Sequence, residues 1–366
     1  MTLHLYFARR FFRAFLVILG MISGLIFLVE IVESIRRFSA SNLDLSQLTL
    51  LTLLTLPESL YGILPLIVII ATIAMFIGLS RTSEMVVTRA AGRSAFRSLG
   101  APVAVALLLG VVTLVALNPI VSATARQHEA MVAELLQGEE RALSVSAEGL
   151  WLRQGNQEGQ TVIRAQRANL DGTVLYNVEL MGIDSDARPV RRINARQAEL
   201  IDGYWRLTRA KEWRLSGRGD IPEQDAVFHA TLDLPTDLTA EGIRDSFGTP
   251  SAIPIWELPE FIEQLDNAGF SALTYRTWFH SQLALPASFV AMVMLGACFT
   301  MRHTRMGRTG IMVLISVLMG FGLYFVRNFA TILAENGQVP VLIAAWTPPV
   351  AAIFLSLGLL LHQEDG

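Results

Sequence analysis

Hydrophobic residues gather in two terminal regions of the chain, and each region holds three long apolar runs. The six runs cover residues 11–32, 62–79, 99–121, 283–301, 310–326 and 339–361. A helix that crosses the roughly 30 Å hydrocarbon core of a bilayer needs about 20 mostly apolar residues. The pattern therefore predicts six membrane-spanning helices in two groups of three, separated by a polar middle segment.

The second and fifth runs are the shortest, and we expect their helices to extend into flanking polar residues that face other protein. The first run follows Arg9, Arg10 and Arg13, an arrangement that also begins a cleaved signal peptide. The run is longer than the apolar core of a signal peptide, and no small-x-small cleavage pattern follows it. We therefore predict that it is a retained span.

The placement of arginine predicts which side of the membrane each segment occupies, because cytoplasmic loops are enriched in basic residues. Ten arginines lie in the N-terminal tail and in the loops after the second and fourth runs, namely Arg9, Arg10, Arg13, Arg81, Arg89, Arg93, Arg97, Arg302, Arg305 and Arg308. The opposite short segments hold three, namely Arg36, Arg37 and Arg327. This bias predicts cytoplasmic termini and a middle segment outside the cytoplasm.

The middle segment begins with a helical continuation of the third span at 125–141 and then changes to short alternating runs. Asp171-Gly172 and Asp202-Gly203 each separate two such runs, which is the pattern of a β-hairpin. A last run covers 226–234. Repeated short strands with glycine turns predict an all-β sandwich or roll.

The segment 254–269, which follows these strands, has the spacing of an amphipathic helix. We expect it to pack on the β domain as a lid, and a docking surface is the alternative. The apolar face is formed by Leu258, Phe261, Ile262 and Leu265, and the polar face by Glu257, Glu260 and Glu263.

Composition supports a membrane protein and excludes several classes of enzyme. Hydrophobic residues make up 52% of the 366 positions and charged residues 17%, whereas soluble domains carry about 25% charged residues. The only lysine, Lys211, follows no glycine-rich phosphate loop, so any ATP that drives this protein is hydrolysed by another subunit. The single Cys298 allows no intrachain disulfide. His229 and His280 have no neighbours at metal-ligand spacing, so we expect no metal, cofactor or catalytic site.

The loop between the second and third runs predicts a short helix at about residues 82–92. Thr82 or Ser83 can cap it, Glu84 suits its first turn, and Gly92 can end it. One interpretation is a linker that lies on the lipid surface. The other is a coupling helix that docks into a groove on a cytoplasmic motor.

Charged residues crowd the outer end of the first span, where they are costly unless they are paired or functional. Glu33 and Arg37 are spaced to pair along the helix. Arg36 and Arg37 are either anchors that reach the interface or an anion site, since guanidinium groups bind phosphate bidentately. Arg327, at the outer end of the fifth span, is a candidate to join them.

These features resemble the LptF/LptG (YjgP/YjgQ) family of lipopolysaccharide export permeases over nearly the whole chain. The most specific part is the segment from Arg81 to Gly92, which looks like the Ser-Glu-x-x-x-x-x-x-x-Gly coupling helix of the family. The strand at 149–151 and the region 257–285 look more like the LptG side. One departure is Glu30, because some relatives carry a basic residue about one turn deeper than Arg36.

The resemblance implies a six-helix membrane bundle with an inserted all-β, jellyroll-like periplasmic domain. The implied division is 1–124 for spans one to three, 125–275 for the β domain with flanking helices, and 276–366 for spans four to six. The implied partners are LptF in a heterodimer, a dimer of the ATPase LptB, the single-span LptC and the periplasmic bridge protein LptA, with lipopolysaccharide as substrate in the bacterial inner membrane.

The resemblance also implies roles for individual residues. Ser83, Glu84, Arg89 and Gly92 match the coupling helix that meets the ATPase, whereas Arg36, Arg37 and Arg327 are the candidates for lipid phosphate. Two other functions remain open from the residues alone. A membrane-anchored scaffold or sensor explains the β domain, and an intramembrane enzyme requires paired ionisable residues that the middles of the spans lack.

Overall fold

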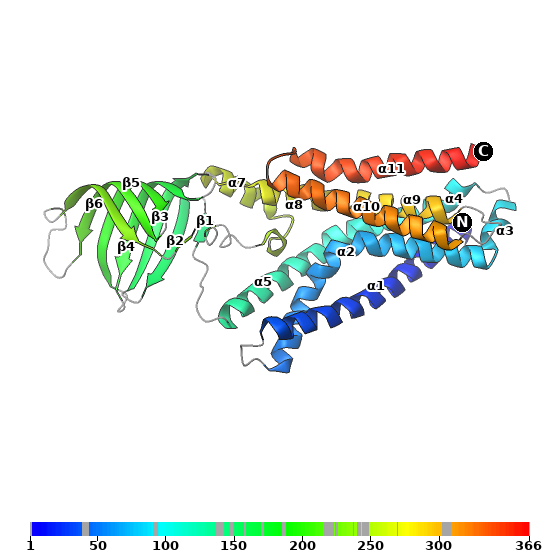
Figure 1. Ribbon diagram of the computed structural model, residues 1–366, viewed down its shortest axis with the longest axis horizontal. Helices are drawn as coiled ribbons and strands as arrows, with labels where there is room; N and C mark the ends of the chain where they lie inside the picture. Colours follow the sequence, from blue (N-terminus) through cyan, green and yellow to red (C-terminus); the bar gives the residue numbers. More distant parts are fainter. Residues whose placement is uncertain are drawn as a thin grey trace. The chain divides into compact units, whose positions relative to one another are not determined.

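The computed structural model describes the chain in two compact units, one made of residues 1–131 with 273–366 and one of residues 132–272. It describes all residues except 1, 39–43, 91–93, 136–142, 147–148, 157–158, 170–171, 185–187, 202, 216–222, 224–225, 237, 240–242, 244–248, 269, 302–308 and 366. The first unit is helical and the second is mainly a β-sheet (Figure 1).

The helical unit contains several long helices (Figure 1). In chain order the helices are α1 (Thr2–Arg37), α2 (Leu45–Arg81), α3 (Glu84–Ala90), α4 (Ala95–Val112), the π-helical turn η1 (Thr113–Leu117), α5 (Asn118–Leu135), α8 (Leu273–Leu283), α9 (Leu285–Thr300), α10 (Thr309–Glu335) and α11 (Val341–Asp365). The second run, at 62–79, is the C-terminal half of α2, which begins 17 residues earlier behind an Asp44–Gln47 capping box.

Five described helical stretches are long and apolar enough to cross a membrane, and the pair α8 and α9 makes a sixth if it counts as one span. This pair bends by 51° between Leu283 and Leu285. Pro286 follows the bend and has no N–H, so the carbonyl of Gln282 loses its helical donor there. The predicted fold class, a six-span bundle with an inserted all-β domain, is confirmed.

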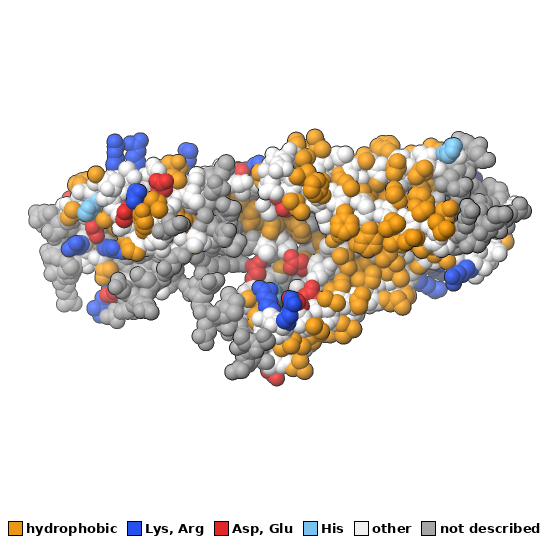
Figure 2. Space-filling view, in the orientation of Figure 1, with side chains coloured by type: hydrophobic (Ala, Val, Ile, Leu, Met, Phe, Trp, Pro, Cys, Tyr) orange, Lys and Arg blue, Asp and Glu red, His pale blue; other side chains and the backbone are white. Residues whose placement is uncertain are grey.

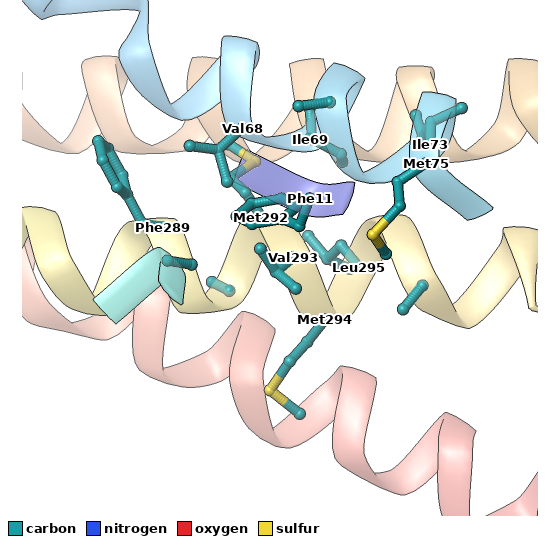
Figure 3. Close-up of a cluster of buried hydrophobic side chains, with 14 of the residues drawn as sticks. Phe11, Val68, Ile69, Ile73, Met75, Phe289, Met292, Val293, Met294 and Leu295 are labelled. Atoms are coloured by element: carbon teal, nitrogen blue, oxygen red, sulfur yellow. The ribbon is translucent and has the colours of Figure 1, made fainter. Parts of the chain in front are cut away.

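The core of the helical unit forms around α9, which is buried along almost its whole length and packs on α2, α4, α10 and α11. Figure 3 shows Phe289, Met292, Val293 and Leu295 of α9 close to Val68 and Ile69 of α2 and to Phe11 of α1. Small residues let these helices approach closely: a Cβ on Gly110 of α4 would lie 2.5 Å from the Cα of Pro286. The two groups of three spans are therefore joined in the interior through α9.

The second unit contains a seven-stranded antiparallel sheet whose strands are joined in the order of the sequence. The strands are β1 (Leu143–Ser146), β2 (Gly149–Asn156), β3 (Gly159–Ala168), β4 (Val174–Ile183), β5 (Pro189–Ile201), β6 (Tyr204–Arg214) and β7 (Val227–Pro235). Both predicted hairpins are confirmed, and Gly172 and Gly203 supply the positive φ angles, +72° and +83°, that their turns require.

One face of the sheet is buried. Side chains at alternating positions, such as Leu152, Ile163 and Leu180, lie on this face. The predicted amphipathic helix is α7 (Leu258–Ala268), and the short 3₁₀ turn η2 (Pro250–Ala252) precedes it. Leu258 and Leu265 of α7 are buried, and the helix packs on β1 and β3 as the predicted lid. The helix starts later than 254 because Pro254 begins a turn. Its carbonyl accepts hydrogen bonds from the backbone N–H groups of Glu257 and Leu258.

Candidate functional site

The loop between α2 and α4 contains α3, a helix of seven residues within the predicted segment 82–92. Thr82 ends α2, and Ser83 takes a left-handed backbone conformation with φ of 59°, which turns the chain sharply into α3. The carbonyl of Ser83 accepts from the backbone N–H of Val87, and the Thr88 hydroxyl donates to the carbonyl of Glu84 at 2.7 Å. The side chain of Arg89 and all of Gly92 lie outside the described residues.

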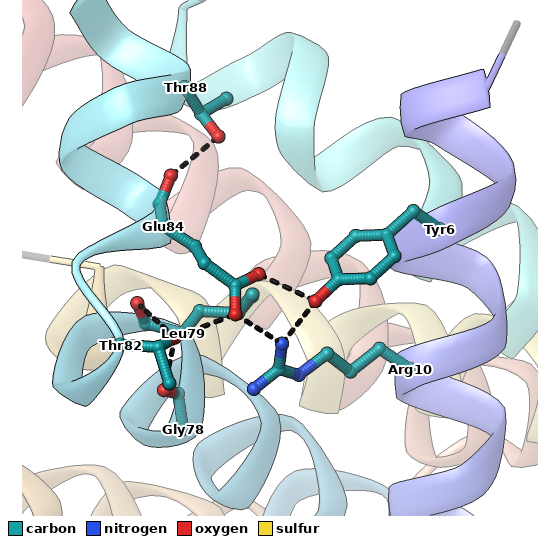
Figure 4. A network of polar contacts seen from close by, with 7 residues as sticks. All are labelled: Tyr6, Arg10, Gly78, Leu79, Thr82, Glu84 and Thr88. Carbon is teal, nitrogen blue, oxygen red and sulfur yellow. Dashed lines mark hydrogen bonds and ion pairs between the residues drawn. The ribbon is translucent and has the colours of Figure 1, made fainter.

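The carboxylate of Glu84 is held by three side-chain donors, two from α1 and one from the end of α2 (Figure 4). Tyr6 donates its hydroxyl to Oε2 at 2.6 Å, and Arg10 donates from Nη1 to Oε1 at 2.6 Å. The Thr82 hydroxyl has one proton, and its closest acceptor is Oε1 of Glu84 at 2.7 Å. Arg10 also donates to the hydroxyl of Tyr6, so the tyrosine and arginine of α1 form one connected group with Glu84.

The network lowers the pKa of Glu84 below its usual value. Partial burial raises this pKa, but the hydrogen bonds from Tyr6, Thr82 and Arg10 and the charge of Arg10 outweigh that effect. Glu84 is therefore a carboxylate at neutral pH. Its side chain remains 32% exposed, so it is reachable from outside the chain.

The sequence pattern does not single out Tyr6 and Arg10 as site residues. It marks Arg10 only as part of the basic N-terminal tail, together with Arg9 and Arg13. The spacing of Tyr6 and Arg10, one helical turn apart, was a usable signal, because it places an aromatic hydroxyl and a guanidinium on one face of a helix. Only the fold shows that this face meets α3.

Arg36 and Arg37 lie at the exposed end of α1, where their guanidinium groups are accessible. The predicted pairing of Glu33 with Arg37 is wrong: Glu33 pairs with Arg36, one residue earlier, at 2.8 Å. Three- and four-residue spacings both share a helix face, and Arg37 instead turns its guanidinium over the ring of Phe38, 5.7 Å from the centroid. Glu30 points towards α2 and accepts from the hydroxyl of Ser59 at 2.8 Å.

Arg327 lies inside the helical unit, and its surroundings differ from those of the α1 arginines. It donates from Nη2 to the carbonyl of Ser281 at 3.4 Å, in the last turn of α8 beside the bend. A cavity of about 10 Å³ next to it is lined by Pro65 and Tyr324, among others.

The part of the chain that the structure describes holds no group of three His, Cys, Asp or Glu side chains that could bind a metal ion. Hydrophobic side chains instead cover a broad area of the helical unit, with charged residues towards its ends (Figure 2). Together with the candidate spans, this surface defines the class: a multi-pass membrane protein with an inserted β domain.

The family follows from comparison with known proteins. Residues 5–362 match the family model of the lipopolysaccharide export system permease LptF/LptG, and the chain belongs to this family. It is also similar to the lipopolysaccharide export system permease protein LptG of Haemophilus influenzae, with 22% identity over 368 residues, which covers 100% of this chain and 99% of the relative. The family model covers LptF and LptG together, and the similarity to an LptG protein favours the LptG side.

Proposed function

We propose that this chain is the permease subunit of an ABC transporter that extracts lipopolysaccharide from the bacterial inner membrane and passes it to a periplasmic bridge. The observation that carries the proposal is the match of the family model along almost the entire chain, together with the helical unit and its inserted β domain. The chain has no phosphate-binding loop, so a separate subunit hydrolyses ATP.

The proposed orientation places both termini and α3 in the cytoplasm and the sheet in the periplasm. The arginine bias of the sequence supports it. The proposed partners are LptF as the second permease, an LptB dimer at α3, LptC in the membrane and LptA as the bridge. Docking of the ATPase needs an accessible charged group at the cytoplasmic end of the helical unit, and Glu84 on α3 supplies one.

The first test concerns docking of the ATPase at Glu84. Glu84→Gln keeps the shape of the side chain and removes its charge, so we expect the ATPase recovered with the permease from mild detergent to fall roughly tenfold, as for the loss of one charge-assisted hydrogen bond. The measurement is quantitative mass spectrometry of the co-purified subunits. Ala90→Ser, on the exposed end of the same helix, is the control. Unchanged ATPase recovery with Glu84→Gln would contradict the docking role.

We further propose that Arg36 and Arg37 bind the phosphate groups of the lipid at the outer end of α1. Both side chains are exposed, and the pair carries two cations against the single partner Glu33. Guanidinium groups form paired hydrogen bonds with phosphate, which suits this chemistry. Arg327 stays a prediction as a third phosphate ligand. Because its guanidinium already donates to the carbonyl of Ser281, the exposed pair on α1 is tested first.

A photo-crosslinker at Ile35 tests this proposal, because Ile35 is exposed beside the pair and its replacement leaves both arginines in place. We expect capture of lipopolysaccharide at Ile35, and at least a severalfold fall when Arg36 and Arg37 are both changed to glutamine. Raising the salt concentration should lower capture in the parent protein, because exposed charges are screened. Capture that is equal with and without the two arginines would refute the phosphate assignment.

A further inference from the structure

Helix α1 connects the proposed ATPase-docking site with the proposed lipid-phosphate site. Helix α1 runs without interruption from Thr2 to Arg37, and its 36 residues span about 54 Å at 1.5 Å per residue. Tyr6 and Arg10 lie near its first end and Arg36 and Arg37 at its last. Because the described helix contains no proline or break, a displacement at one end is carried to the other.

Most of the apolar stretch of helix α1 lies at the surface of the helical unit. In its most apolar stretch 6% of the residues are buried, whereas the corresponding stretch of α2 is 67% buried. Its main packing partners within the described unit are α2 and α4. Because most of the side chains in this stretch face outwards, α1 can shift with less repacking of protein contacts than α2.

The contacts of Glu84 connect helix α1 to α3. The bonds from Tyr6 and Arg10 to the carboxylate bridge α1 and α3, and the bond from Thr82 fixes the same carboxylate to the end of α2 (Figure 4). The guanidinium of Arg10 also lies against the last turn of α2, with Nη2 3.5 Å from the place that a Cβ of Gly78 would occupy. The cation is thus close to the carbonyl end of α2, which favours positive charge.

We propose that Tyr6 and Arg10 are positioning residues that couple α3 to α1, so that docking of the motor at Glu84 moves the first span and the arginines at its far end. This coupling rests on the proposed function and describes how binding of the motor regulates the lipid site. The carboxylate has about four acceptor positions, and three donors occupy three of them. Oε1 takes Arg10 and Thr82 and Oε2 takes Tyr6, so one position on Oε2 remains.

The free position on Oε2 defines the partner chemistry. A lysine or arginine of the motor can donate to it while Arg10 keeps its own bond to Oε1. The carboxylate then bridges two cations, one from α1 and one from the motor. A force applied by the motor to α3 reaches α1 through this shared group.

The experiment compares Tyr6→Phe and Arg10→Met with Arg9→Met, which removes a charge from an adjacent, exposed position of the same helix. The full transporter is assembled with its ATPase in proteoliposomes that contain lipopolysaccharide. Three quantities are measured: ATPase bound to the permease, ATP hydrolysed, and lipid released per ATP. We expect ATPase binding to persist in both variants and lipid released per ATP to fall roughly three- to tenfold, as for the loss of partly exposed charge-assisted bonds.

Arg10→Lys should recover part of the coupling, because it keeps the charge but not the forked geometry. If Arg10→Met and Tyr6→Phe release as much lipid per ATP as Arg9→Met, the inference is overturned while the docking role of Glu84 stands. If Arg10→Met instead loses ATPase binding to the same extent as Glu84→Gln, Arg10 serves docking alone and the inference is again overturned. Failure of the docking proposal has a different result, namely ATPase binding that survives Glu84→Gln.

Discussion

Gly110→Ala is expected to destabilise the helical unit by about 1–3 kcal/mol, the usual cost of overpacking a close helix contact. The added Cβ would lie 2.5 Å from the Cα and 2.9 Å from the Cβ of Pro286. Both atoms belong to a proline whose ring fixes the local backbone, so no flexible side chain can move aside. Either α4 or α9 must shift, and this contact joins the first three spans to the last three.

Thermal inactivation of the purified permease in detergent, followed by size-exclusion chromatography of the surviving folded protein, measures this effect. Gly62→Ala is the matched control, because its added Cβ meets no atom within 4 Å. Alanine also favours helix more than glycine does, so the control should be neutral or slightly more stable. A Gly110→Ala protein that is as stable as Gly62→Ala would show that α4 and α9 are not in close contact.

Trp205→Ala is expected to cost the β domain about 3–5 kcal/mol, the range for truncating a large buried aromatic side chain. Trp205 is fully buried in β6 and lies opposite Leu200 of β5 and Leu234 of β7. Its removal leaves a cavity under the buried face of the sheet. Because folded domains are stable by only about 5–15 kcal/mol, this loss is a large part of the total.

Pulse proteolysis of the full-length protein in increasing urea measures the stability of the β domain through cleavage within residues 132–272. Trp256→Ala is the matched control in the same unit, since 61% of Trp256 is exposed. We expect a change within about 0.5 kcal/mol for the control, as for most surface substitutions. Equal shifts for the two tryptophans would contradict the position of Trp205 in the core.

The two predictions test the parts on which the function depends. Under the proposed function, α1 moves while α9 holds the remaining spans together, and Gly110 lies at a close contact of that part. The proposed function also requires the sheet to remain folded to receive a lipid. Losses at either place should abolish export without altering Glu84 or the arginine pair, which separates folding defects from coupling defects.

Several features were determined by local properties of the sequence. Each apolar run is long enough to cross a bilayer, and burial of a run of this kind in lipid does not depend on its neighbours. The turns at Gly172 and Gly203 are similarly local, because only the two residues of the turn set the required backbone angles. The arginine bias predicts orientation for the same reason, since it is a count along the chain.

Only the tertiary structure decided the partners of the charged residues. Whether Glu33 meets Arg36 or Arg37 depends on small differences between two equally spaced positions, and Arg327 contacts Ser281 because a bend in a distant span leaves a carbonyl there. The sequence predicts Glu84 as a docking residue, but its bonds to Tyr6 and Arg10 cross 78 and 74 positions. Spacing along one helix cannot show such contacts, because they depend on how α1 packs beside α2 and α3.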